Sequence, residues 1–80
     1  MKASNRLRLI VTKEGRAPSF LAQPGRHDHL ELVEIESGEV VLYWDLEPRE
    51  ASRAARAMRE DLIRMEDDDF LAKWGADQAG

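Results

Sequence analysis

Apolar and polar residues alternate near the start of the chain with the period of a half-buried β-strand. Over residues 6–12 the apolar face consists of Leu7, Leu9 and Val11. Residues 13–26 contain two Gly and two Pro, which interrupt helices and strands, so this segment is predicted to be a loop. A loop of this length in a small domain is expected to be functional or mobile, with Phe20 anchoring it to the core.

The alternation continues in two further segments that predict a β-hairpin. Residues 29–36 form the second predicted strand, and their apolar phase slips after Leu32, which indicates a β-bulge near that residue. Ser37 and Gly38 predict a two-residue turn, because Gly accepts a positive φ. Residues 40–44 are apolar at every position, so the third strand is expected to be central or covered on both faces.

A helical period replaces the strand period at Pro48, where preceding acidic residues and the Pro itself predict a helix start. Apolar residues then recur as one stripe, made of Ala51, Ala54, Ala55, Met58, Leu62 and Met65. The acidic run 66–69 would oppose the dipole of a helix that ended there, so we expect a break. Asp67 or Asp68 is predicted to cap a second short helix that ends at Gly75. Its apolar face consists of Phe70, Leu71 and Trp74.

Together these segments predict an α+β fold: a three-stranded antiparallel sheet (β-β-β) followed by one long amphipathic helix and a short C-terminal helix. Residues 1–75 are expected to form a single small domain, and residues 76–80 a frayed tail. The β-β-β-α order is similar to that of small bacterial regulatory modules, including antitoxin domains of the HicB kind, although no motif of that family accompanies it.

The composition limits how so small a domain can be stabilised. The chain has 80 residues and no Cys, so neither disulfides nor thiolate-bound metals supplement its core. Packing, or association with another chain, must supply the stability. The apolar run at residues 9–11 is far too short for a signal segment or a membrane span, so we expect a cytoplasmic protein. Nine Arg against three Lys, with abundant Ala, indicate a bacterial genome rich in G and C.

Charge is distributed along the chain in alternating blocks. Residues 1–26 carry six basic side chains and one acidic one, whereas residues 27–48 carry seven acidic side chains and no Lys or Arg. Such an arrangement favours pairing between a basic first strand and an acidic second strand. The blocks therefore predict charge pairs within one fold.

Two histidines give the sequence its only metal-like pattern. In an extended segment His27, His29 and Glu31 lie on one face and offer two nitrogens and one oxygen. The segment resembles a fragment of the cupin metal motif, but a single residue separates His29 from Glu31 where that motif has three or four. Two His and one acid do not complete a closed four-ligand site, so we expect no metal and no other cofactor, and a metal-binding protein that uses His27 and His29 is only the second alternative function.

Four arginines, Arg49, Arg53, Arg56 and Arg59, lie on the polar side of the long helix. A row of this kind can follow nucleic-acid phosphates, which makes a nucleic-acid-binding accessory domain the alternative function. Acidic residues interrupt the row, however, and the whole chain is acidic with a pI of about 5.1. We therefore expect a solvated face. No nucleophile, phosphate loop or acid–base pair stands out, so enzymatic activity is not expected.

One amphipathic helix covers only one face of a three-stranded sheet, yet the predicted strands are apolar on both faces. The uncovered face predicts a contact surface for a second copy of the chain or for another protein. Its predicted residues are Ile10, Val41, Tyr43, Phe70 and Trp74. The loop at Phe20 and the short C-terminal helix are the other candidates for covering it. The sequence thus predicts a small protein-interaction or regulatory module that acts as a homodimer or as a subunit of a complex.

Overall fold

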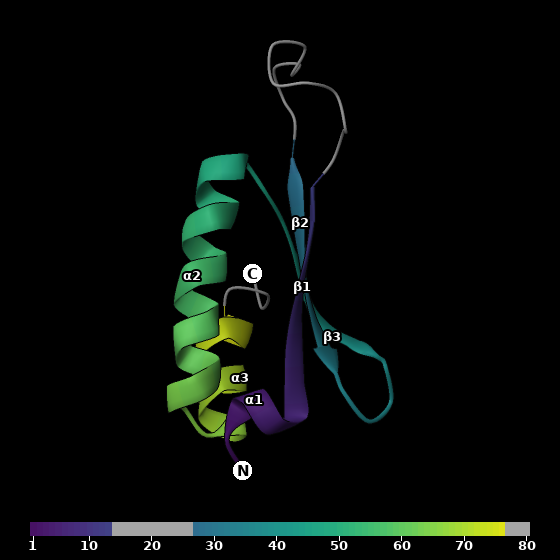
Figure 1. Cartoon of the computed structure of the whole chain (residues 1–80), viewed down its shortest axis with the longest axis vertical. Coiled ribbons are helices and arrows are strands. Elements are labelled where there is room, and N and C mark those ends of the chain that lie inside the picture. Colours follow the sequence, from purple (N-terminus) through teal and green to yellow (C-terminus); the bar gives the residue numbers. More distant parts are fainter. Residues whose placement is uncertain (14–26, 77–80) are drawn as a thin grey trace.

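The computed structural model describes residues 1–13 and 27–76. Phe20 and most of the predicted loop, together with the tail from residue 77, lie outside these residues. The elements in order are α1 (Ala3–Arg6), β1 (Leu7–Lys13), β2 (Asp28–Glu34), β3 (Val40–Leu46), α2 (Pro48–Arg64) and α3 (Asp67–Gly75) (Figure 1). The predicted α+β class is confirmed, and α1 is an additional helical turn that the pattern did not indicate.

The sheet is an antiparallel meander with strand order β1-β2-β3. β2 is therefore central and β3 is an edge strand, so the expectation that the third strand is central was wrong. The register between β2 and β3 shifts after Leu32, at the predicted place, because Leu32 pairs with Leu42 whereas Val33 pairs with Val40. The extra residue is Val41, so the bulge lies on β3 and not on the second strand.

The connection between β2 and β3 is longer than the predicted two-residue turn. It spans residues 35–39, and the Gly38 N–H donates to the Glu34 carbonyl at 2.8 Å, which closes a wider turn. Gly38 has a φ of 75°. This left-handed conformation strains any residue with a side chain, and it explains why the turn needs Gly at this position.

The long helix α2 and the short helix α3 both follow the predicted pattern. α2 buries Ala51, Ala55, Met58 and Leu62 along the apolar stripe, and it ends where Met65 becomes extended. α3 has three acidic residues in its first turn and Lys73 in its last, an arrangement that suits the helix dipole at both ends. The N-cap of α3 is Glu66, and not Asp67 or Asp68 as predicted, and its side chain makes no capping hydrogen bond.

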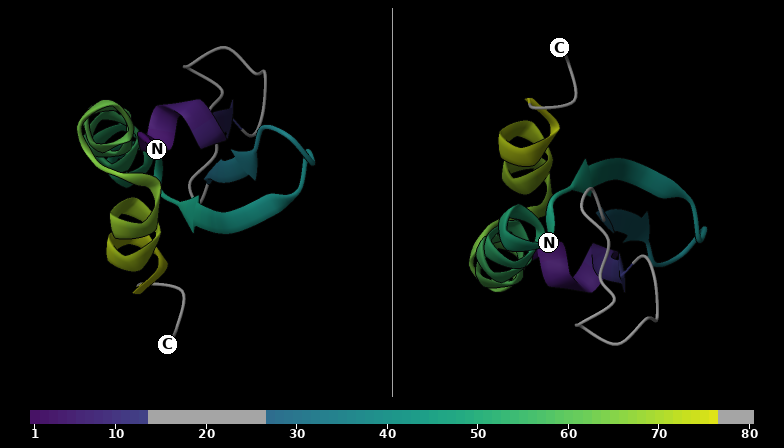
Figure 2. Two further views of the ribbon diagram at one scale, coloured as in Figure 1. Left: turned by 90° about the horizontal axis from the view of Figure 1, so that it is seen from below. Right: turned by 90° about the horizontal axis from the view of Figure 1, so that it is seen from above.

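All three helices lie on one side of the sheet, as Figures 1 and 2 show. The core between the layers contains Leu7, Leu30, Leu32, Trp44, the apolar stripe of α2, and Phe70 from α3. Trp74 of α3 packs edge-on against Trp44, with ring centroids 6.3 Å apart. The short C-terminal helix therefore belongs to the helix layer, and no described helix covers the opposite face of the sheet.

The N-terminal segment contacts the junction between α2 and α3. The Ala3 N–H donates to the Met65 carbonyl at 2.9 Å, and Ala3 is completely buried. Arg6 donates to the Asp67 carboxylate at 2.9 Å and lies 3.5 Å from the Glu34 carboxylate. The Arg6 guanidinium lowers the pKa of Asp67 below its ordinary value. Residues from the start of the chain thereby hold the junction between α2 and α3.

Candidate functional site

The face of the sheet turned away from α2, called here the outer face, is assembled by strand alternation. Leu30 and Leu32 are buried against the helices, so Glu31 and Val33 point outward. Ile10 and Tyr43 flank Glu31 in the register, and Arg8 and Val40 flank Val33. Because of the bulge, Val41 lies outward beside Val40.

The outer face exposes several large apolar side chains. The exposed fractions are 41% for Ile10, 48% for Val40, 39% for Val41 and 44% for Tyr43. Val33 is partly buried between them. Isolated apolar residues are ordinary on protein surfaces, whereas a contiguous group on one sheet face marks a contact surface.

The structure does not bring all five sequence-predicted contact residues together. Ile10, Val41 and Tyr43 share the outer face, but Phe70 is fully buried and Trp74 packs in the helix layer on the other side of the sheet. The grouping of Phe70 and Trp74 with the outer face was wrong, because α3 turns back along α2. Conversely, sequence reasoning missed Val40. Regular alternation along the third strand would place Val40 on the helix side, but the bulge turns it to the outer face.

Polar side chains gather at one end of the outer face. His27 Nδ1 lies 2.8 Å from Asp45 Oδ1, and His29 Nδ1 lies 2.6 Å from the Tyr43 hydroxyl. The His29 and Tyr43 rings stack with centroids 5.7 Å apart. Among the described residues, the acid within 4 Å of both histidines is thus Asp45 of β3, and not Glu31 as the spacing suggested. Among residues 1–13 and 27–76, no three metal-ligating side chains converge on one point.

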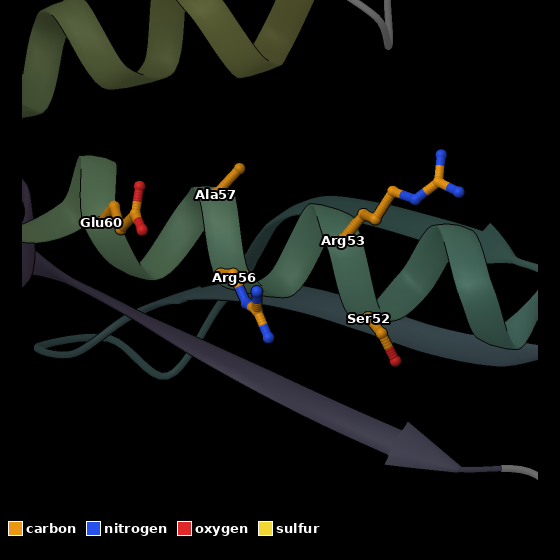
Figure 3. Close-up of a pocket in the computed structure, with 5 residues that line it drawn as sticks. All are labelled: Ser52, Arg53, Arg56, Ala57 and Glu60. Atoms are coloured by element: carbon orange, nitrogen blue, oxygen red, sulfur yellow. The ribbon is translucent and has the colours of Figure 1, made fainter.

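The four candidate arginines of α2, Arg49, Arg53, Arg56 and Arg59, are exposed, but they do not form one row. Figure 3 shows a shallow hollow on α2, lined by Ser52, Arg53, Arg56, Ala57 and Glu60. Arg53 extends to one side of the helix, whereas Arg56 and Ser52 point to the other side, where β1 lies (Figure 3). The helix therefore divides its arginines between two surfaces.

The surface on the β1 side is a groove of about 420 Å³, called here the basic groove. Three basic side chains line it: Lys13 of β1 with Arg56 and Arg59 of α2. Small residues of α2 leave room for it, namely Ala51, Ser52 and Ala55. Asp28, which is only 2% exposed, contributes a carboxylate to the wall. In the part of the chain that the structure describes, no carboxylate forms an ion pair with any of the three cations.

Sequence reasoning missed Lys13 and Asp28 as members of a site. Lys13 was assigned to the predicted loop, whereas in the structure it pairs with Asp28 at the ends of β1 and β2. The Arg-rich face of the predicted helix was a visible signal. Where this face meets β1 and β2 depends on how α2 crosses the sheet, which the pattern of one sequence does not specify.

The chain matches no protein-family model, and no curated protein or solved structure is similar enough to count as a match. Within the described residues, every helix is too short or too polar to cross a membrane. The case for a function therefore comes from the two surfaces themselves.

Proposed function

We propose that this chain is a small protein-interaction or regulatory module that assembles through the outer face of its sheet, with a second copy of itself as the partner. The observation that supports the proposal is the exposure of Ile10, Val40, Val41 and Tyr43 on a sheet face that no described helix covers. Fully burying an apolar side chain of this size is worth roughly 1.5–3 kcal/mol, so covering the 39–48% of these residues that is still exposed is worth roughly 1 kcal/mol each.

A homodimer is the simplest assembly for such a face. One surface then serves both subunits, and twofold dimers are the commonest protein oligomers. The face is narrow, however: three strands about 4.8 Å apart and seven residues long give an area of roughly 14 by 23 Å. This area is small beside the roughly 800 Å² that each partner buries in a standard interface. We therefore expect association at micromolar concentration.

The test is the mass of the protein in solution. Light scattering coupled to gel filtration at about 100 μM, well above a micromolar dissociation constant, should give twice the 9.1 kDa mass of the chain. Tyr43→Lys places a charge on the outer face, and the variant should be monomeric with an unchanged circular dichroism spectrum.

Ile63→Lys is the matched control, because Ile63 is 69% exposed on α2 and lies away from the sheet. This variant should keep the mass of the wild type. A wild type that stays monomeric at all concentrations would refute self-association. Loss of the dimer in both Lys variants would show that the outer face is not the contact surface.

A further inference from the structure

The basic groove lies on the helix side of the sheet, so its chemistry is independent of assembly through the outer face. Lys13, Arg56 and Arg59 come from two elements and line the same hollow, and no described carboxylate pairs with them. Three cations held around one concave surface repel one another, and an anion relieves that repulsion. Guanidinium groups also offer paired N–H donors that match phosphate oxygens.

We propose that the basic groove binds a small phosphate ester, a nucleoside monophosphate or a sugar phosphate, with the phosphate among Lys13, Arg56 and Arg59. The volume of about 420 Å³ lies within the range of small-molecule sites, which is about 300–1,000 Å³. Ala51, Ser52 and Ala55 keep the α2 wall low enough for a sugar-sized group beside the helix.

Asp28 decides which part of the ligand lies deeper. Asp28 is 2% exposed and belongs to the groove wall, so its negative charge disfavours a second anionic group there. Carboxylate oxygens accept several hydrogen bonds, and sugar hydroxyls are suitable donors. The groove therefore suits a ligand with one phosphate and neighbouring hydroxyls better than inorganic phosphate or a polyphosphate.

The same residues argue against a nucleic-acid track. A strand of nucleic acid needs cations spread along its backbone, whereas Arg56 turns toward β1 and Arg53 turns away from it (Figure 3). The cations on the β1 side converge on one hollow. The expected ligand is consequently a small molecule.

Isothermal titration calorimetry of the full chain at low salt tests the proposal with adenosine monophosphate, ribose 5-phosphate, inorganic phosphate and adenosine. The two phosphate esters should bind with dissociation constants of about 1 mM or below, and adenosine should not bind measurably. Arg56→Gln combined with Arg59→Gln should weaken both esters about tenfold, because two charge-assisted contacts are lost.

Arg49→Gln combined with Arg53→Gln is the matched control, since it removes the same charge from the same helix although neither residue lines the basic groove. It should change ester affinity by less than about twofold, as expected of exposed charges screened by solvent. Asp28→Asn should weaken ribose 5-phosphate relative to inorganic phosphate, and circular dichroism of that variant reports whether it folds.

Three results would overturn the proposal. The first is the absence of binding by either ester at millimolar concentration. The second is equal loss of affinity in the two double variants, which would indicate unspecific attraction. The third is tighter binding of a single-stranded oligonucleotide that both double variants weaken equally, which would indicate a nucleic-acid track along α2.

Discussion

Asp61 links α2 to α3 through a single carboxylate oxygen. Its Oδ2 accepts hydrogen bonds from the Lys73 ammonium at 2.6 Å and from the Trp74 indole N–H at 3.0 Å. The hydrogen bond from Lys73 is the main cause that lowers the pKa of Asp61 below its ordinary value of 3.8, and the bond from Trp74 adds to it. The folded state therefore favours the ionised carboxylate more than the unfolded state does.

This preference makes stability depend on pH in a defined direction. A lowered folded-state pKa stabilises the fold above pH 3.8, and that contribution is lost as the pH falls through the folded-state value. Asp61→Asn should lower the free energy of unfolding by about 1–2 kcal/mol at pH 7, and the difference should shrink in acid. Urea denaturation at both pH values measures it.

Glu60→Gln is the control for Asp61→Asn, because Glu60 is the exposed neighbour on α2. This variant should unfold like the wild type at neutral pH. If Asp61→Asn proved as stable as Glu60→Gln at pH 7, the link between α2 and α3 would have no energetic weight.

At the scale of elements, α3 depends on one aromatic anchor. Phe70 is completely buried, and its ring lies 6.2 Å from that of Trp74, which in turn packs against Trp44. Phe70→Ala should therefore cost about 3–5 kcal/mol, through lost burial and the cavity it leaves. A domain of this length has a total stability of roughly 4–12 kcal/mol, so the variant should be largely destabilised.

Chemical denaturation of Phe70→Ala beside Leu71→Ala separates anchoring from helix propensity, because Leu71 is only partly buried in the same helix. The Leu71 variant should lose clearly less stability. Equal losses would mean that α3 is held by its backbone and charges and not by the aromatic contact.

The elements also show what the sequence can and cannot specify. The stripe of α2 and the acidic break before α3 are local signals, and both predictions are confirmed. The side of the sheet on which α3 packs follows from the extended backbone at Met65. The apolar pattern of neither helix predicts this backbone conformation. The phase slip after Leu32 located the irregularity but not the strand that carries it, since an extra residue on either strand explains the same slip.

At the scale of the whole molecule, the charge blocks pair partly as predicted. The expected pair between the basic first block and the acidic second block is present, since Arg6 lies 3.5 Å from the Glu34 carboxylate, but Arg6 also donates to Asp67, which is 61 residues away along the chain. Only the placement of α1 at the α2–α3 junction brings these residues together. The two surfaces differ in the same way in how far the sequence predicts them. Strand alternation predicted Ile10, Val41 and Tyr43 on the outer face, whereas the basic groove forms only because α2 lies beside β1.

The position of Glu31 distinguishes a twofold homodimer from other assemblies through the outer face. In the register Glu31 lies between Ile10 and Tyr43, at the middle of the exposed apolar group. Residues near the middle of a twofold interface approach their own copies, so two Glu31 carboxylates would come close together and lose water. Glu31 is thus an unfavourable group inside the proposed dimer.

Glu31→Gln should therefore strengthen the dimer about tenfold, which corresponds to about 1.4 kcal/mol, as measured by sedimentation equilibrium. Glu36→Gln carries the same change in the exposed turn after β2 and should leave the dissociation constant unchanged. A partner protein that met Glu31 with a basic side chain would give the opposite sign, because the substitution would then remove an attraction. Weaker self-association of Glu31→Gln would accordingly contradict the twofold packing of outer faces, even if the wild type is a dimer.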